Sequence, residues 1–334
     1  MKVVFKQITG GSGVDTWANN LSQEIIKQGI DSSVKYFPQY YAFFPQLLSF
    51  KNEKLNGSYI THSNIAYGFA FKTDLPLVVT EHHLVHDPSF SQYITTPQKA
   101  YYKFVYKCEE KSLKVANVVT CISKYTKQKL EEIFGYYDSK MIYNGVNIDI
   151  FKPMAVEKKN YGIPETTTVL FFAGNLSKRK GGDLLPKIMN KVGDDFILLA
   201  TSGLRNDFKE ETKNIRTIGR LSEKELVKAY NLCDIFLFPS RLEGFGLTVA
   251  EAMACGKPVV TTNCSSLPEL IVDGKGGFLC KIDDINNFAD NIIMLAGDEN
   301  MREKMGKYNR ERVLEKFTLK KMAEEYIKIY RNSI

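Results

Sequence analysis

The chain has 334 residues, so two domains of roughly 150 residues each are expected. Hydrophobic residues make up 44% of the chain and charged residues 25%, which excludes a disordered or fibrous protein. The net charge of +7 favours an anionic partner, and phosphorylated ligands, nucleic acid and an acidic membrane surface all fit that charge.

The cysteine pattern and the apolar runs indicate a cytoplasmic protein. The six cysteines form no C-x-x-C pair and no zinc-like spacing with the four histidines, which indicates reduced thiols. The first apolar run is too short for a signal peptide, and no later run approaches the roughly 18 residues that span a bilayer. We therefore expect the protein to be made and kept in the cytoplasm.

Short apolar runs alternate with segments of helical period along the whole chain. This alternation predicts an α/β fold, with parallel sheets that carry helices on both faces. The runs with strand character are residues 3–5, 77–79, 118–121, 169–172, 196–199, 235–238 and 259–261. The first helix is expected to be capped by Asp15 or Thr16 and to end at Gly29. Its buried face would hold Trp17, Leu21 and Ile25.

A glycine-rich turn follows the first predicted strand. Gly11 and Gly13 let the backbone approach a ligand and leave amides that can point at a phosphate. The dinucleotide fingerprint G-x-G-x-x-G is incomplete, because Thr16 stands where the third glycine belongs. A tight turn without a ligand is the alternative interpretation.

Two segments of the first half, residues 36–45 and 99–107, combine aromatic with basic residues. This composition is typical of a surface that rests on anionic lipid. The alternative is ordinary packing, since Tyr102 and Val105 also fit an amphipathic helix against its own domain.

Three of the four histidines, His82, His83 and His86, follow the strand predicted at residues 77–79. A metal site is the less favoured interpretation, because His82 and His83 would point to opposite faces of a strand. Glu81 is a weaker candidate for binding a hydroxyl group.

A domain boundary is expected at residues 144–153, where turn formers interrupt the periodicity. After the next strand, Lys178, Arg179 and Lys180 lie in a glycine-containing loop. Cations at the carboxyl end of a strand suggest a diphosphate clamp, although a solvated basic loop has the same composition. The loop is not a P-loop, because G-x-x-x-x-G-K-[ST] is absent.

The stretch RLEGFGLTVAEAMACGKPVV places Glu243 before a glycine turn and Glu251 within the helix that follows. Thr248 and Glu251 also fit a capping box, in which Glu251 only satisfies the start of the helix. That interpretation leaves Glu243 unexplained. A carboxylate repels phosphate, so these two are expected to face sugar hydroxyls or a developing positive charge.

These residues resemble the retaining glycosyltransferases of family 4, which have the GT-B fold. Glu243 and Glu251 match the E-x7-E signature of that family. The resemblance also covers residues 143–146, 174–182, 219–226 and 317–330. It implies two Rossmann-like domains whose parallel sheets face each other across a cleft. Residues 1–150 would bind the acceptor, residues 151–316 would bind the nucleotide sugar, and residues 317–334 would form a helix that crosses back to the first domain.

The resemblance also implies roles for particular residues. Glu243 and His82 would lie at the transferred sugar and form the catalytic pair, and Glu251 would hold the nucleotide ribose. The other donor-binding residues would be Lys180, Arg179, Gly246, Leu247, Thr248, Gly11, Gly13, Gly219 and Leu221. Asn175 departs from the family pattern, which has an arginine there, and Lys178 or Arg179 is expected to compensate for it.

The implied activity is a hexosyl transfer with retained anomeric configuration, from a UDP- or GDP-sugar to a hydroxyl of a saccharide acceptor. No cofactor is expected, and no divalent metal is required, since the sequence lacks a D-x-D motif. The acceptor would be lipid-linked, in bacterial surface polysaccharide or lipopolysaccharide synthesis, with peripheral contact to the anionic inner face of the plasma membrane. Neither the sugar, the base, the linkage nor the oligomeric state is specified by the sequence.

Three other interpretations fit parts of the pattern. A nucleotide-sugar epimerase or a sugar phosphorylase shares the two-domain architecture. A sugar-nucleotide-binding protein without catalysis needs only the binding residues. A nucleic-acid binder is suggested by charge alone and has no reader motif, so we expect no nucleic-acid partner.

Overall fold

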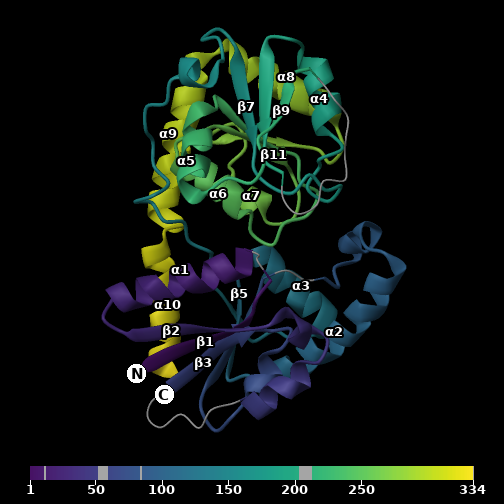
Figure 1. Ribbon diagram of the computed structural model, residues 1–334, viewed down its shortest axis with the longest axis vertical. Helices are drawn as coiled ribbons and strands as arrows, with labels where there is room; N and C mark the ends of the chain where they lie inside the picture. The colour runs from purple at the N-terminus through teal and green to yellow at the C-terminus, as the bar shows by residue number, and fades with distance from the viewer. Residues whose placement is uncertain (11–12, 52–58, 83–84, 203–212, 334) are drawn as a thin grey trace. The chain divides into compact units, whose positions relative to one another are not determined.

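The computed structural model describes residues 1–10, 13–51, 59–82, 85–202 and 213–333 (Figure 1). The chain divides into two compact units, each described by itself here: unit 1 is Met1–Gly145 with Leu319–Ile334, and unit 2 is Val146–Thr318. Each unit contains a six-stranded sheet in which neighbouring strands run parallel. The α/β class predicted from the alternation of elements is therefore confirmed.

The sheet of unit 1 has the strand order β2-β1-β3-β4-β5-β6. Its strands are β1 (Lys2–Ile8), β2 (Asp31–Phe37), β3 (Tyr59–Asn64), β4 (Leu77–Glu81), β5 (Val118–Cys121) and β6 (Ser139–Met141). Its helices are α1 (Gly13–Lys27), α2 (Thr96–Val115), α3 (Lys124–Phe134) and α10 (Leu319–Asn332). Four short 3-10 helices complete it: η1 (Gln39–Ala42), η2 (Pro45–Lys51), η3 (Gly68–Phe71) and η4 (Pro88–Tyr93).

Helix α10 belongs to the core of unit 1, although it is encoded at the other end of the chain. It packs against α1, and its buried residues share one apolar cluster with β1 and β3. A buried polar chain joins it to the sheet: the His62 ring lies 2.6 Å from both the Tyr330 hydroxyl and the Thr80 hydroxyl. Because buried polar groups are costly unless paired, this network fixes the position of α10 on the sheet.

Helix α1 begins at Gly13, three or four residues earlier than a cap at Asp15 or Thr16 would place its start. Asp15 and Thr16 lie inside the first turn, so the expected cap at either residue is wrong. The Asp15 carboxylate instead accepts a hydrogen bond of 3.0 Å from the Gly10 amide. The predicted buried face of Trp17, Leu21 and Ile25 is confirmed, and the chain leaves the helix at Gly29 with φ of +82°.

The sheet of unit 2 has the strand order β12-β11-β10-β7-β8-β9. Its strands are β7 (Thr168–Phe172), β8 (Phe196–Ala200), β9 (Ile215–Thr217), β10 (Ile235–Phe238), β11 (Val259–Thr262) and β12 (Gly277–Cys280). Its helices are η5 (Lys158–Tyr161), α4 (Leu185–Val192), α5 (Glu223–Leu232), α6 (Leu247–Ala254), α7 (Leu267–Leu270), α8 (Ile285–Gly297) and α9 (Glu299–Lys316).

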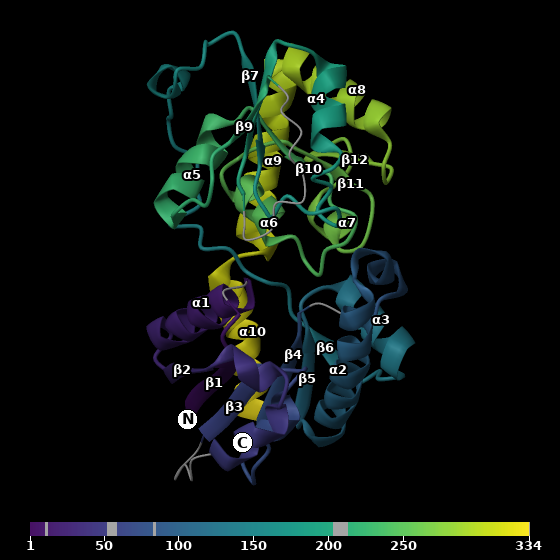
Figure 2. The same cartoon turned by 45° about the vertical axis from the view of Figure 1, so that its right-hand side comes forward.

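Helices cover both faces of the unit 2 sheet, with α4 packed on α8 and α6 packed on α9 (Figure 2). All strands run parallel, so the loops that follow β7, β8, β9, β10 and β11 leave at one edge of this sheet. In the same way, the loops that follow β1 and β4 leave at one edge of the sheet of unit 1. Open α/β sheets bind their ligands at this carboxyl edge.

Candidate functional site

At the carboxyl edge of unit 2, the loop after β7 packs closely against the end of β10. Gly181 has φ of +75°, and a Cβ atom there would lie 2.1 Å from the Pro239 carbonyl oxygen. The Arg241 amide also donates a 2.8 Å hydrogen bond to the Arg179 carbonyl. Only glycine allows this approach, which brings the basic loop of residues 178–180 beside Glu243.

Arg241 holds the loop after β7 in place beside the end of β10. Its guanidinium donates to both oxygens of the Asp183 carboxylate, at 2.6 and 2.8 Å, and to Asp283 at 2.6 Å. It also donates to the Lys178 carbonyl. Arg241 is buried, so this cation holds the two loops together and is not a ligand contact. This role could not be predicted from the sequence, because Asp183 and Asp283 come from other loops.

Glu243 is buried at the centre of the group, with 8% of its surface exposed. One carboxylate oxygen lies 3.0 Å from the Lys180 ammonium and 3.4 Å from an Arg179 nitrogen, and it accepts a 2.7 Å hydrogen bond from Ser240. Burial alone would raise the pKa of Glu243, but the two cations outweigh it and lower that pKa to about 2. Glu243 is therefore ionised at neutral pH.

Lys180 and Arg179, predicted to clamp a diphosphate, thus already share one carboxylate. Lys180 also lies over the Phe238 ring, at 5.0 Å from its centre. Burial lowers the pKa of Lys180, and the charge of Glu243 opposes that shift. Asn175 and Lys178 are exposed on the same loop. Of the two residues expected to compensate for Asn175, Arg179 is the one that the structure places beside Glu243.

Gly246 is the last residue of the loop and the N-cap of α6, and its φ is +92°. The helix therefore starts at Leu247, so the capping box formed by Thr248 and Glu251 is wrong. Thr248 lies in the first turn, and its buried hydroxyl has no hydrogen-bond partner among the described residues. The first amides of a helix lack intrahelical partners. The backbone amides of Leu247 and Thr248, together with the Thr248 hydroxyl, are therefore hydrogen-bond donors at the start of α6.

Glu251 lies one turn further along α6. It accepts a 2.7 Å hydrogen bond from the hydroxyl of Tyr230, a fully buried residue of α5. Burial raises the pKa of Glu251 to about 7. The hydrogen bond from Tyr230 lowers this pKa, but burial has the larger effect. The charge of Glu251 acts on Lys180, so the two predicted carboxylates and the lysine form one electrostatic group. Sequence reasoning missed Tyr230, which lies 21 residues before Glu251.

Gly219 and Leu221, predicted to lie at the nucleotide base, are in the loop between β9 and α5. Gly219 has φ of +72°, and its carbonyl accepts a 3.1 Å hydrogen bond from the Ser202 amide after β8. Among the described residues, no hydrogen bond or ion pair joins this loop to Glu243 or Glu251, so it lies at the same sheet edge but in a separate loop.

In unit 1, His82 follows β4 and borders a cavity of about 320 Å³ that is also lined by Thr9, Gly10 and Glu81. The His82 ring packs edge-on against Trp17, with ring centres 4.4 Å apart. Burial lowers the pKa of His82 to about 3, so the ring is neutral at physiological pH. Its Nε2 atom has no hydrogen-bond partner in the described part of the chain.

The other predicted residues of unit 1 are only partly placed. Gly13 is the first residue of α1 and is exposed. Gly11 and His83 lie outside the described residues. His86 turns toward α2, where its Nε2 lies 2.9 Å from the Glu109 carboxylate. Within the described ranges, no three metal-ligating side chains come together.

Comparisons with known proteins agree on one group of enzymes. A family model described as "Glycosyltransferase Family 4" matches residues 34–150, and one described as "Glycosyl transferases group 1" matches residues 154–312. N-acetyl-alpha-D-glucosaminyl L-malate synthase of Bacillus anthracis is 29% identical over 226 residues, which cover 64% of this chain and 59% of that protein. The chain thus spans less than two thirds of the length of the curated relatives it matches first.

Solved structures resemble the whole chain. Sucrose-phosphate synthase from Thermosynechococcus elongatus has a TM-score of 0.85 at 19% identity and covers 98% of both chains. Anabaena HepE, solved in complex with UDP-glucose, has a TM-score of 0.80 at 16% identity and covers 99% of this chain and 100% of its own. At these identities the likeness shows the fold.

Proposed function

Since the chain belongs to glycosyltransferase family 4 and has the GT-B fold, we propose that it is a retaining hexosyltransferase that uses a nucleotide diphosphate sugar. One observation carries the proposal: a buried, ionised Glu243 shares its carboxylate with Lys180 beside the start of α6. The desolvation of two charges is costly, and this pair lies at the carboxyl edge of the sheet beside the helix start, which supports a role in binding or catalysis.

In this proposal, unit 2 holds the donor. The diphosphate binds Lys180 and Arg179 together with the donors of Gly246, Leu247 and Thr248, whose unpartnered hydroxyl then gains an acceptor. Glu251 accepts hydrogen bonds from the ribose diol. The base contacts the backbone of Gly219 and Leu221, and the glycine turn of Gly11 and Gly13 contacts the donor from unit 1.

The transfer itself breaks the bond between the anomeric carbon and the diphosphate oxygen. The acceptor hydroxyl forms the new bond on the same face, and its proton passes to the departing phosphate, so the configuration is retained. Glu243 stabilises the positive charge that develops at the anomeric carbon, and Lys180 stabilises the negative charge on the leaving group. His82 is neutral, so it contributes hydrogen bonds and shape rather than charge.

We propose that no cofactor or divalent metal is needed, because Lys180, Arg179 and the helix amides supply the positive charge that a metal would supply elsewhere. Activity that is unchanged by EDTA is the expected result. An EDTA-treated enzyme that regains activity only with added Mg²⁺ or Mn²⁺ contradicts this part of the proposal.

The donor is proposed to be a UDP- or GDP-sugar. The HepE structure contains UDP-glucose, and a mannosyltransferase of Corynebacterium glutamicum that is 28% identical is named as GDP-mannose-dependent. The acceptor is proposed to be a saccharide, lipid-linked, in surface polysaccharide or lipopolysaccharide synthesis. Relatives support this: one protein of Staphylococcus aureus is named for capsular polysaccharide biosynthesis, and the WaaG structure for lipopolysaccharide biosynthesis.

We also propose that the protein makes peripheral contact, from the cytoplasm, with the anionic inner face of the plasma membrane. Five large apolar side chains of η1, η2 and their neighbours are exposed: Tyr40, Phe43, Phe44, Leu47 and Phe50. Lys51 lies close enough to Tyr40 to affect its titration, so the patch carries a cation. Exposed aromatics beside a lysine favour an anionic bilayer surface. No helix in the described ranges is long and apolar enough to cross a membrane.

The decisive experiment measures thermal stabilisation by UDP, GDP and their sugars, followed by NMR of the product formed with the stabilising donor. A single base series should raise the melting temperature, since it binds only the folded state. The product should keep the anomeric configuration of the donor. Inversion, or stabilisation by no nucleotide, overturns the proposal.

The same samples separate the alternatives. A new sugar nucleotide that forms without an acceptor identifies an epimerase, and a reaction that depends on inorganic phosphate identifies a phosphorylase. Nucleotide binding without turnover over a broad acceptor panel identifies a binding protein.

A further inference from the structure

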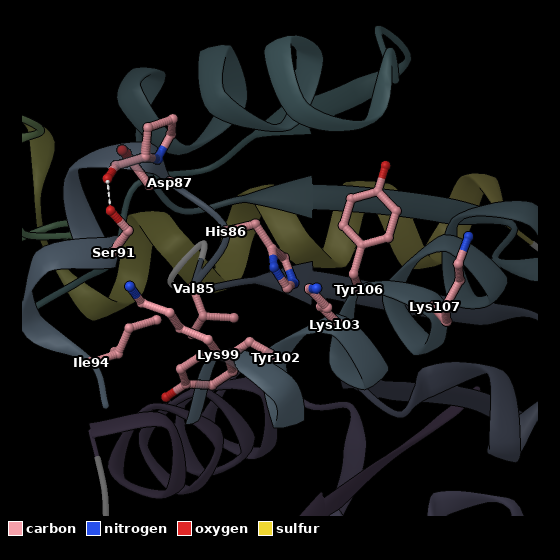
Figure 3. Close-up of a pocket in the computed structure, with 11 residues that line it drawn as sticks. Val85, His86, Asp87, Ser91, Ile94, Lys99, Tyr102, Lys103, Tyr106 and Lys107 are labelled. Atoms are coloured by element: carbon pink, nitrogen blue, oxygen red, sulfur yellow. Dashed lines mark hydrogen bonds between the residues drawn. The ribbon is translucent and has the colours of Figure 1, made fainter. Parts of the chain in front are cut away.

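A second cavity of unit 1, of about 420 Å³, is lined by side chains of residues 85–94 and of α2 (Figure 3). The two cavities share Val85 and Tyr102 as lining residues. The two cavities are therefore neighbours within unit 1. The proposed function uses only the cavity that His82 lines.

Three lysines of α2 border the second cavity: Lys99, Lys103 and Lys107. They are spaced four residues apart, so they lie on one face of the helix, and all three are exposed. Lys107 lies 3.4 Å from Glu110, but the ammonium groups of Lys99 and Lys103 have no ion pair among the described residues. Like charges at this spacing destabilise an isolated helix, so folding alone does not favour the row.

The other groups of the cavity do not neutralise this charge. Asp87 also lines it, but its carboxylate accepts hydrogen bonds from Ser89 and from the Tyr125 hydroxyl. His86 lies against Glu109, and this pair carries no net charge when one proton is shared between the two. The cavity therefore has three cations against one anion that is already hydrogen-bonded.

The wall of the cavity is aromatic and tightly held. The Tyr106 ring stacks on Phe134 at 4.6 Å between ring centres, and its edge contact with His86 is 5.2 Å. Aromatic rings suit the apolar face of a sugar, and ammonium groups suit phosphate oxygens. This combination is a preformed place for a sugar phosphate.

We propose that this cavity holds the phosphate or diphosphate group of a phosphorylated acceptor, bound by Lys99, Lys103 and Lys107, while the acceptor sugar extends into the cavity of His82. The proposal rests on the proposed function, because it assumes that unit 1 binds the acceptor. It names the acceptor class as an anionic glycosyl phosphate, as opposed to a neutral saccharide.

The test uses the full chain with its lysines converted to ¹³C-dimethyl-lysine, which keeps the positive charge and gives each lysine an NMR signal. Saturating UDP first occupies the donor site of unit 2. Single Lys99→Gln, Lys103→Gln and Lys107→Gln variants assign the three signals. Inorganic pyrophosphate should then shift these signals with saturation. In Lys103→Gln, the remaining two signals should titrate about tenfold more weakly, as for the loss of one charge-assisted hydrogen bond.

Lys114→Gln is the matched control, because Lys114 lies on the same helix but does not line the cavity. It should leave the pyrophosphate affinity unchanged. Equal weakening in Lys114→Gln and Lys103→Gln shows only a general charge effect and overturns the proposal. The absence of any shift in the three signals overturns it as well.

Two further titrations distinguish the sources of the phosphate. Glucose 1-phosphate should bind more tightly than inorganic phosphate, because its ring enters the neighbouring cavity; equal affinities mean an ion site without an acceptor role. Shifts caused only by phosphatidylglycerol vesicles mean a lipid headgroup contact, which also contradicts an acceptor subsite. If neither UDP nor GDP stabilises the protein, the proposed function fails. If one of them binds and the signals of Lys99, Lys103 and Lys107 do not shift, only the subsite fails.

Discussion

The two units share one architecture but differ in chemistry at the carboxyl edges of their sheets. In unit 2 that edge is ionic and already paired: Lys180 with Glu243, and Arg241 with Asp183 and Asp283. In unit 1 it is mostly uncharged, with a neutral His82 against Trp17 and a cavity with apolar walls. This difference indicates that unit 2 is preorganised for a charged ligand group that is the same in every substrate. Unit 1 relies instead on shape and on a few local charges.

Removing the central carboxylate of unit 2 should have the largest effect. Glu243→Gln is expected to lower kcat roughly a hundredfold to a thousandfold, because the developing positive charge loses the carboxylate that stabilises it. Steady-state kinetics measures this, and Glu165→Gln, an exposed change in the same unit, is the control. A kcat within threefold of the parent enzyme means that Glu243 only neutralises Lys180.

Glu251→Gln should come next, through donor binding. We expect the donor KM to rise by roughly tenfold to a hundredfold, since Gln cannot accept both hydrogens of a ribose diol. Tyr230→Phe should raise it less, because the Glu251 carboxyl stays in place, although the loss of the Tyr230 hydrogen bond raises its pKa further. A donor KM in Glu251→Gln equal to that of the parent enzyme removes Glu251 from the site.

The raised pKa of Glu251 makes this binding dependent on pH. Below its pKa of about 7 the carboxyl is protonated and accepts fewer hydrogen bonds, so the donor KM of the parent enzyme should rise as pH falls from 8 to 6. In Glu251→Gln that dependence should disappear. A parent enzyme with a flat profile contradicts the protonation argument but leaves the binding role standing.

His82 tests the other side of the comparison. Its pKa of about 3 keeps it neutral between pH 5 and pH 8, so it should act without titrating. We expect His82→Phe to lower kcat by about tenfold, the effect of a lost hydrogen bond, and to leave the shape of the pH profile unchanged. A profile that loses an ionisation in this variant shows that His82 exchanges a proton during turnover.

The smallest effect is expected from the exposed aromatic patch. In the triple variant Phe43→Ser, Phe44→Ser and Phe50→Ser, a smaller fraction of the protein should float with phosphatidylglycerol vesicles. Its melting temperature should stay the same, because these side chains are largely exposed. Ile293→Ser, an exposed apolar change in unit 2, is the control. Equal flotation of the two variants argues against membrane contact at this patch.

Part of the fold was predictable because buried central strands are continuous apolar runs. All seven predicted runs are strands, among them β7 and β10 at the centre of the unit 2 sheet. Five strands were missed. Four of them are edge strands: β2 alternates polar residues, β6 and β9 are three residues long, and β12 is four residues long. The fifth, β3, lies inside its sheet, but its buried centre is polar, with Thr61, His62 and Ser63. Edge strands are buried less, so their sequences carry less of this signal.

The site was predictable only as far as residues follow strands or fit motifs. Glu243, Glu251 and Lys180 could be named because each lies in a loop or helix after a parallel strand. Their pairing could not, because the Lys180 to Glu243 contact joins residues 63 positions apart through the packing of Gly181 on Pro239. The capping prediction failed for a similar reason, since Gly246 with its positive φ starts the helix before Thr248.

The position of α10 in unit 1 has a consequence for synthesis on the ribosome. Unit 2 is one uninterrupted segment, but the core of unit 1 needs residues of α10, such as Tyr326 and Tyr330, beside Trp17 and His62. The N-terminal 145 residues leave the ribosome long before α10 does. Unit 2 can therefore finish folding first, while the part of the unit 1 core that α10 covers, beside α1, stays exposed until α10 is synthesised.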